Sequence, residues 1–175
     1  DYKRLRDNSV NHGLTYALDE PAEWLADFRP YSPVDETPKV GALPDPTDLD
    51  YALLRICGEP GKTKAHPDDS RPRGWFKLPT IEHEFESNSF LLIAQHPDSM
   101  PMQLAIDERS VIGLNANRTR VQYKTNTLSG SSGSPCFNNR LDLVALHQAG
   151  DPKYRDTIYG EVNQGIPIHH VRASI

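Results

Sequence analysis

A short segment rich in serine and glycine contains the residues best suited to covalent chemistry. Residues 130–135 have the sequence Gly-Ser-Ser-Gly-Ser-Pro, which places Ser132 between Gly130 and Gly133. Glycine permits backbone conformations and close approaches that a Cβ atom would block. If Ser132 is a nucleophile, the N–H groups of Ser132 and Gly130 can both point at one developing oxyanion. The alternative is an ordinary surface turn, because Gly/Ser clusters usually mark loops.

The segments that must position this loop have the patterns of β-strands. Polar and apolar residues alternate over 120–125, just before the loop, and an apolar run over 143–146 follows it and leads to His147. Further short apolar runs predict strands at 90–96, 102–106, 110–114 and 165–168. Several short strands separated by turn signals are typical of a sandwich or barrel. The final residues, 169–175, predict a short helix.

An acidic residue stands at the start of another predicted strand. Residues 48–56 form a short apolar run of the length expected for a buried strand, and Asp50 lies at its entrance. Asp50 could simply be a turn residue. It could also be a carboxylate that the apolar segment buries, able to orient a histidine and stabilise an imidazolium. Asp45 and Asp48 are weaker candidates because they lie further into residues 30–48, a proline-rich stretch that predicts a long surface loop.

Composition excludes several classes of protein. The chain has 175 residues, enough for one domain or two small halves, and its 15 prolines and 11 glycines favour a loop-rich β protein. A net charge of −5 shows no excess of basic residues, which makes nucleic acid an unlikely partner. No run approaches the roughly 18 apolar residues of a membrane span.

Cysteine usage gives an expectation about compartment. Cys57 and Cys136 lie in apolar surroundings without CxxC or metal-site spacing, so we expect two buried thiols and no metal. Buried thiols are compatible with a reducing compartment. No signal peptide is visible, although the sequence starts at Asp1 without a methionine. A cytoplasmic location is the resulting expectation.

The acid-led strand and the GxSGSP loop about 80 residues later together resemble the trypsin-like (chymotrypsin-fold) serine peptidases. The resemblance implies an all-β fold, a chymotrypsin-like double β-barrel. It also implies that Asp50 is the triad aspartate, that Ser132 is the nucleophile, and that the amides of Gly130 and Ser132 form the oxyanion hole. The strand ending in His147, followed by Gly150, resembles the wall of the primary specificity pocket.

More narrowly, residues 1–7, 126–136 and 163–168 resemble bacterial intracellular trypsin-like peptidase domains. Those domains are fused to, or encoded beside, effector-associated and signalling modules of presumed conflict systems. The resemblance implies a protein or peptide substrate, a regulatory domain or partner chain, and a role in bacterial signalling or defence. It divides the chain into residues 1–74, the remainder of an N-terminal barrel with the Asp-bearing strand and a linker, and 75–175, a C-terminal barrel.

The family's histidine is the one element without a clear match. It normally lies in a Thr-Asn/Ala-His-His/Cys-Val-like stretch, which this sequence does not contain. His12 lies 38 residues before Asp50, but residues 10–13 are polar and turn-like, whereas the family's histidine follows a buried strand. We therefore expect the histidine upstream of Asp1 and the first barrel to be incomplete in this chain.

The resemblance also implies a mechanism and a specificity. Peptide hydrolysis would proceed through an acyl-enzyme without metal or organic cofactor. Thr127 and His147 match positions at which glutamyl endopeptidases and picornavirus-type cysteine proteases hydrogen-bond a P1 Glu or Gln, which implies a polar P1 preference over Lys or Arg. The alternative is that His147 only packs under the sheet. Ser131 replaces the aspartate of zymogen-activated trypsins, so we expect control by fused or partner domains.

Two other functions compete with this one. A catalytically inactive, protease-like binding or scaffold module is the main alternative, and the missing histidine supports it. An α/β-hydrolase esterase does not fit, because its GxSxG elbow requires a strand-turn-helix context. Here Pro135 and the β-like run over 143–146 follow the serine.

Overall fold

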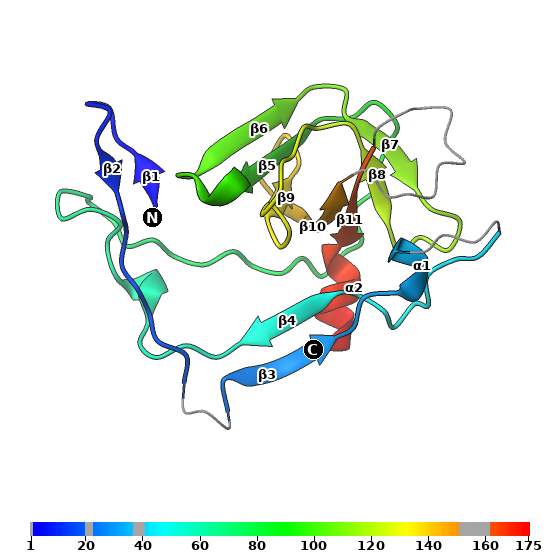
Figure 1. The fold of residues 1–175 in the computed structure, drawn as a ribbon, viewed down its shortest axis with the longest axis horizontal. Coiled ribbons are helices and arrows are strands. Elements are labelled where there is room, and N and C mark those ends of the chain that lie inside the picture. The colour runs from blue at the N-terminus through cyan, green and yellow to red at the C-terminus, as the bar shows by residue number, and fades with distance from the viewer. Residues whose placement is uncertain (1, 20–22, 37–40, 151–161) are drawn as a thin grey trace.

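The computed structural model describes residues 2–19, 23–36, 41–150 and 162–175. Most of the regular structure belongs to one antiparallel sheet with the strand order β6-β5-β9-β10-β11-β8-β7. Its strands are β5 (Leu91–Gln95), β6 (Gln103–Asp107), β7 (Val111–Leu114), β8 (Val121–Tyr123), β9 (Pro135–Phe137), β10 (Leu143–Gly150) and β11 (Asn163–Pro167). The sheet curls strongly into a half-barrel (Figure 1). The predicted all-β, chymotrypsin-like class is confirmed.

The predicted strands of this sheet form because their apolar residues recur with a period of two. In β5, Leu91, Ile93 and Gln95 are buried and alternate with half-buried neighbours, so one face of the strand lines the core. The long strand β10 contains register shifts between Leu143 and Ala145 and between His147 and Ala149. Bulges of this kind bend a strand and increase its twist, which helps the sheet to curl.

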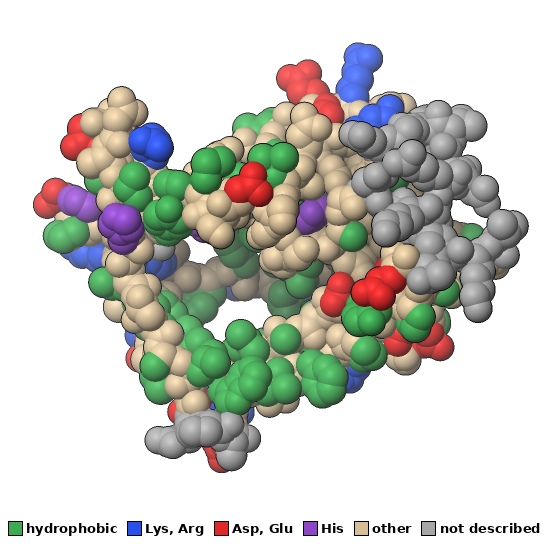
Figure 2. All heavy atoms as spheres, in the orientation of Figure 1, with side chains coloured by type: hydrophobic (Ala, Val, Ile, Leu, Met, Phe, Trp, Pro, Cys, Tyr) green, Lys and Arg blue, Asp and Glu red, His purple; other side chains and the backbone are tan. Residues whose placement is uncertain are grey.

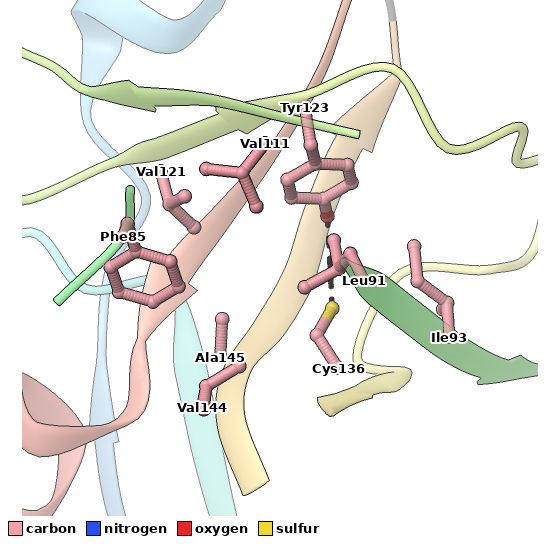
Figure 3. Close-up of a cluster of buried hydrophobic side chains, with 9 residues drawn as sticks. All are labelled: Phe85, Leu91, Ile93, Val111, Val121, Tyr123, Cys136, Val144 and Ala145. Atoms are coloured by element: carbon pink, nitrogen blue, oxygen red, sulfur yellow. Dashed lines mark hydrogen bonds between the residues drawn. The ribbon is translucent and has the colours of Figure 1, made fainter. Parts of the chain in front are cut away.

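The concave side of the sheet is filled by a compact apolar cluster (Figure 3). Its buried members are Phe85, Leu91, Ile93, Val111, Val121, Tyr123, Cys136, Val144 and Ala145. Cys136 is fully buried, as predicted, and burial raises the pKa of its thiol to about 12. Cys57 is exposed, so the expectation of two buried thiols is wrong for this residue. Cys57 lies in the surface chain after β4, where its sulfur contacts the Leu18 carbonyl oxygen at 3.4 Å.

A second cluster joins the sheet to the N-terminal half through the C-terminal helix. Helix α2 (Ile168–Ser174) begins directly after β11 and confirms the predicted short helix. Ile168 and Val171 pack in one buried cluster with Leu49 and Tyr51. The Tyr51 hydroxyl also lies 3.0 Å from Ser174 Oγ, so β4 contacts the last turn of α2. None of the helices in the described ranges has the length and apolar character that a membrane span requires.

The described part of the N-terminal half forms two separate two-stranded ladders. One pairs β1 (Lys3–Arg4) with β2 (Val10–Asn11), and the other pairs β3 (Leu25–Arg29) with β4 (Tyr51–Leu54). The strand predicted at 48–56 is present, but the prediction of its burial is wrong beyond Tyr51, since Leu53 and Leu54 are exposed. No further described strand pairs with the β3–β4 ladder, and apolar side chains gather over it (Figure 2).

The proline-rich stretch over 30–48 is not simply a surface loop. It contains a one-turn helix, α1 (Pro33–Glu36), and Asp35 of this helix reaches the fully buried Arg120 beside β8, with 2.7 Å between Asp35 Oδ2 and Arg120 Nη2. Arg120 Nη2 also donates to the carbonyl oxygen of Asp48. The stretch therefore docks on the large sheet through a buried ion pair. The described residues also form two 3₁₀ turns, η1 (Pro60–Lys62) and η2 (Pro97–Ser99).

Candidate active site

The serine loop is attached to β10 by backbone hydrogen bonds. The Gly133 N–H donates to the His147 carbonyl at 2.7 Å, and the His147 N–H donates to the Ser134 carbonyl at 2.8 Å. Gly130 and Gly133 have φ values of 84° and 83°, a region that glycine adopts without steric cost. Ser132 is exposed between them, and its Oγ donates to the Gln148 carbonyl oxygen at 2.9 Å. The candidate nucleophile therefore lies at the surface beside β10.

The backbone amides of this loop divide into bonded and free groups. The N–H groups of Ser131, Gly133 and Ser134 all donate to backbone carbonyls. Those of Gly130 and Ser132 donate to no acceptor within the described residues. These are the two amides that the sequence assigned to an oxyanion hole. Two fixed, unused donors flanking a serine hydroxyl are what stabilisation of a tetrahedral intermediate requires.

The turn after β5 supports the loop at Gly130. The Asp98 N–H in η2 donates to the Ser129 carbonyl at 2.7 Å. A Cβ atom on Gly130 would lie 3.6 Å from the His96 carbonyl oxygen and 3.7 Å from the Asp98 nitrogen. Asp98 and Ser99 themselves have positive φ values of 49° and 60°. A backbone turn in a sparsely populated conformation thus packs directly against the candidate oxyanion loop.

Strand pairing places the predicted pocket residues on one face of the sheet. His147 is paired with Gly165, Gly150 with Asn163, and Asn163 with Tyr123. Paired residues of an antiparallel ladder point to the same side, and residues two apart on one strand share a face. His147, Tyr123 and Asn163 therefore face the same way, and Tyr123 packs against Gly165, where a Cβ atom would lie 3.2 Å from the Tyr123 hydroxyl oxygen.

His147 is held by a buried tyrosine. Its Nδ1 lies 2.7 Å from the Tyr123 hydroxyl, and only 3% of the residue is exposed. Burial lowers the pKa of His147 to about 4, so the imidazole is neutral at ordinary pH. Both the pocket interpretation and the packing interpretation of His147 require such burial, but the free ring nitrogen, Nε2, has no partner among the described residues.

Thr127 and Gly150 meet at Asn163. The Thr127 Oγ1 donates to Asn163 Oδ1 at 3.0 Å, and the Asn163 Nδ2 donates to the Thr125 carbonyl at 2.6 Å. A Cβ atom on Gly150 would lie only 2.9 Å from Asn163 Oδ1, so a larger residue there would have to displace the Asn163 amide. The structure thus brings Thr127, in the connection after β8, and Gly150 together at the end of β10, the strand that also holds His147.

Asp50 lies in the other half of the chain, at the start of β4. Its N–H donates to the Pro30 carbonyl at 2.9 Å, and its φ of 45° is unusual for a residue other than glycine. The residue is exposed, which contradicts the expected burial, because the strand it precedes is largely uncovered. Its carboxylate has no hydrogen-bond partner among the described residues.

Comparison with known proteins adds a decisive observation. Residues 11–146, most of the chain, match the family model of the trypsin-like peptidase domain. The chain belongs to this family. Trypsin-like peptidases are serine hydrolases whose substrates are proteins, and the serine loop and the half-barrel described above are consistent with that class.

Two relatives are similar to this chain over part of their own length. The uncharacterized protein y4fB of Sinorhizobium fredii is 30% identical over 125 residues, which is 68% of this chain and 18% of the relative. A glutamyl endopeptidase of Staphylococcus epidermidis is 26% identical over 121 residues, 67% of this chain and 40% of the relative. The chain therefore spans less than half the length of these relatives.

None of the described histidines of this trypsin-like peptidase domain hydrogen-bonds Ser132 or Asp50. His12, the weak candidate from the sequence, stacks on Tyr2 with ring centroids 6.0 Å apart, and Tyr2 in turn stacks on His96 at 5.7 Å. His12 directly follows β2, and Tyr2 stacks between its ring and that of His96, the residue before η2. In the parts of the chain that are described, no group of three His, Cys, Asp or Glu residues could hold a metal ion.

Three residues that matter to this geometry were not identified from the sequence. Tyr123 orients His147, Asn163 binds Thr127, and Gln148 receives the Ser132 hydroxyl through its carbonyl. Tyr123 and Asn163 do fall within segments with strand patterns or family resemblance. Their contacts depend on which strands pair and in which register, and no local signal gives that information.

Proposed function

We propose that this chain is the nucleophile-bearing part of a serine endopeptidase that cleaves proteins after a Glu or Gln residue. The observation that supports this best is the serine loop. Ser132 presents its hydroxyl at the surface, and the free amides of Gly130 and Ser132 lie beside it while the other loop amides are bonded.

The proposed reaction follows the acyl-enzyme route. Ser132 Oγ forms a bond to the scissile carbonyl carbon while a histidine base takes its proton, and the carbonyl oxygen becomes an oxyanion held by the Gly130 and Ser132 amides. The C–N bond then breaks as the histidine returns the proton to the leaving amine. Water attacks the resulting ester by the same route. Asp50, exposed and without a described partner, orients the histidine. The Ser132 hydroxyl must first leave the Gln148 carbonyl, which needs only rotation about χ1.

The P1 preference rests on Thr127 and His147. Both are held by neutral partners within the described residues, Asn163 and Tyr123, and no described cation or carboxylate contacts them. A neutral polar pocket favours a side chain with a carbonyl group over an uncompensated Lys or Arg. The name of the staphylococcal relative, a glutamyl endopeptidase, supports a polar P1 residue.

The domain organisation is part of the same proposal. Residues 75–175 form the C-terminal barrel, and residues 1–74 contribute to an N-terminal barrel. The exposed apolar residues of the β3–β4 ladder support this, because a two-stranded ladder is marginal by itself. Amide hydrogen exchange in β3 and β4 should be slower in the full-length protein than in residues 1–175. Equal exchange in the two would contradict this part of the proposal.

Control by a fused or partner domain, in a bacterial signalling or defence pathway, completes the proposal. Ser131 gives the loop no carboxylate with which to bind a newly formed N-terminus. Activity should therefore rise on adding the regulatory module. Unchanged activity with every module encoded in or beside the full-length protein would argue against this form of control.

An inactive binding module is the second candidate. It is favoured by one observation: in the described part of the chain the Ser132 proton goes to the Gln148 carbonyl and no histidine hydrogen-bonds the Ser132 hydroxyl. A module that only binds peptides could use the same pocket and the same β10 edge. It would not form a covalent bond with an acylating or phosphonylating reagent.

The deciding experiment is labelling with a fluorophosphonate, which bonds to an activated serine Oγ and releases fluoride. Intact mass is measured for the full-length protein and for residues 1–175, each beside Ser132→Ala. Labelling that disappears in Ser132→Ala supports the peptidase, and labelling of the full-length protein alone shows that residues outside this chain complete the site. Absence of labelling in a folded full-length protein, with candidate activators present, would favour the inactive module.

A further inference from the structure

A bulge in β10 leaves Gln148 outside the regular pairing of the sheet. The pairing of β10 with β11 shifts register between His147 and Ala149, so Gln148 has no partner residue on β11. The extra residue of a bulge is released from the ladder, and bulges often re-aim a side chain beside a functional site. Backbone pairing with β11 therefore does not fix the position of Gln148.

The serine loop contacts β10 at this bulge. Ser132 Oγ donates to the Gln148 carbonyl oxygen at 2.9 Å. The Gly133 N–H donates to the carbonyl oxygen of the preceding residue, His147, at 2.7 Å. Both hydrogen bonds join the loop to two consecutive residues of β10. The position of the Ser132 hydroxyl therefore depends on where Gln148 lies.

The side chain of Gln148 is held by a carboxylate from the other half of the chain. Its Nε2 donates to Asp35 Oδ2 at 2.9 Å, and its Oε1 accepts from Gln164 Nε2 at 2.9 Å. Asp35 lies in α1, which Figure 1 shows beside the large sheet. Gln148 and the Asp35 side chain are both buried, so water competes little for these contacts.

The partners of Asp35 require a hydrogen-bond acceptor at both of its side-chain oxygens. Oδ1 accepts from Gln164 Nε2 at 3.0 Å. Oδ2 accepts from Gln148 and from the Arg120 guanidinium. A guanidinium carries only donors, and an amide nitrogen donates. A carboxylate meets all three partners, whereas an asparagine of the same size would turn a donor toward one of them.

The same cluster reaches the segment that leads to Asp50. Arg120 Nη2 donates to Asp35 and also to the Asp48 carbonyl oxygen, at 2.7 Å and 2.6 Å. Asp48 lies two residues before Asp50, the proposed orienting carboxylate. One buried cluster thus connects the bulge beside Ser132 with the segment that leads to Asp50.

We infer that Asp35 is a positioning residue of the proposed peptidase: its carboxylate fixes the bulged residue Gln148, and thereby the position of Ser132. The inference rests on the proposed function, since Ser132 is the proposed nucleophile. Asp35 acts through Gln148 and does not touch the reacting atoms.

The test measures two rates for the full-length protein under conditions in which urea unfolding shows each variant to be folded. One is fluorophosphonate labelling of Ser132, and the other is cleavage of a peptide with Glu or Gln at P1. Asp35→Asn should slow labelling on the order of tenfold or more, because a small displacement of a nucleophile lowers its rate steeply. In cleavage, kcat should fall with little change in KM, since the variant alters the reacting geometry and not the binding of the peptide.

Gln148→Met shows whether the effect passes through Gln148. This variant keeps the backbone carbonyl but loses the amide that contacts Asp35, so it should also slow labelling. Adding Asp35→Asn to Gln148→Met should then slow labelling little further, because residues that act through one contact are not additive.

Ile168→Ala is the matched control for lost stability. It removes apolar atoms from the buried cluster that contains Leu49 and Tyr51, and so weakens the contact between the two halves without changing the Asp35 cluster. It should therefore unfold at lower urea but label Ser132 at close to the wild-type rate.

The outcomes separate this inference from the proposed function. If the wild-type protein is neither labelled nor active with its candidate activators present, the proposed peptidase fails and this inference fails with it. If the wild type is labelled and a folded Asp35→Asn or Gln148→Met protein is labelled equally fast, the peptidase stands and this inference is overturned. A full additional effect of Asp35→Asn in the Gln148→Met protein, or equal slowing by Ile168→Ala, would also overturn it.

Discussion

Ser131 Oγ donates a hydrogen bond to Gln95 Oε1 at 2.7 Å inside the protein. Ser131 is 1% exposed and Gln95 5% exposed. Gln95 ends β5, and its Nε2 lies 3.3 Å from the Asn126 carbonyl oxygen. The residue directly before the candidate nucleophile is thus anchored by a neutral side chain of the same sheet. This contact occupies the position at which zymogen-activated relatives are expected to use an aspartate.

The Ser131–Gln95 contact predicts the effect of changing Gln95. Gln95→Leu leaves the Ser131 hydroxyl buried without a partner, which should cost about 1–3 kcal/mol of unfolding free energy. It should also slow fluorophosphonate labelling of Ser132 in the full-length protein, because the loop loses its anchor. Gln95→Glu keeps an oxygen that accepts from Ser131 and should label closer to the wild-type rate. Equal labelling by wild type and Gln95→Leu would show that the anchor does not position the loop.

Gly130 should be sensitive to any side chain. Its φ of 84° lies in the left-handed region, so Gly130→Ala should cost about 1–2 kcal/mol and should displace the Gly130 amide, which we propose as an oxyanion donor. Gly74→Ala is a matched control, with a φ of 77° and no atom within 4 Å of the added Cβ. Both variants should lose similar stability in urea unfolding, but only Gly130→Ala should lose labelling at Ser132. Parallel losses of labelling would contradict a special role for the Gly130 amide.

The buried ion pair between Asp35 and Arg120 should dominate the contact between the two halves of the chain. Asp35→Leu leaves the fully buried Arg120 guanidinium without its counter-charge and should lower the unfolding free energy by about 3–5 kcal/mol. Glu82→Gln changes the exposed pair with Arg118 and should cost about 1 kcal/mol or less. Urea unfolding of both variants checks this. Similar small losses for the two would mean that the half containing α1 contributes little to the stability of the large sheet.

His147 should make the fold less stable in acid. Burial lowers its pKa in the folded state to about 4, below the ordinary value of 6.5. Between these values the unfolded chain binds a proton that the folded chain does not, so stability falls as the pH decreases from about 6.5 toward 4, by an amount on the order of 3 kcal/mol. His147→Gln should flatten this part of the pH dependence, measured by urea unfolding. A His147→Gln profile parallel to that of wild type would contradict the neutral, buried imidazole.

Much of this protein is determined by local sequence. The period of two in segments such as 90–96 and 120–125 predicted strands that the structure contains, because alternation by itself puts one face of a strand into a core. The glycines around Ser132 predicted a loop with positive φ values, since few other residues adopt them. The helix after residue 167 was also predictable from its local pattern.

Burial in the N-terminal half could not be predicted in the same way. Leu53, Leu54 and Cys57 are in apolar stretches, yet all three are exposed, because burial depends on what covers a strand and not on the strand itself. Conversely, Asp35 lies in a proline-rich stretch that predicts a surface loop, and it is buried against Arg120, far away in sequence. An apolar pattern shows that a segment can be buried, and only the tertiary arrangement supplies the partner.

In the candidate site, too, local sequence predicted some features and the tertiary structure decided the others. The sequence by itself predicted the family, which the comparison confirms, and a candidate nucleophile loop, since Ser132, its glycines and their spacing are contiguous. Only the tertiary structure decided that Gln95 anchors Ser131, that Tyr123 holds His147, and that Asn163 takes the proton of Thr127. Those contacts join strands that are distant in the chain. Their existence depends on pairing register, and a shift of one residue would turn each side chain to the opposite face of the sheet.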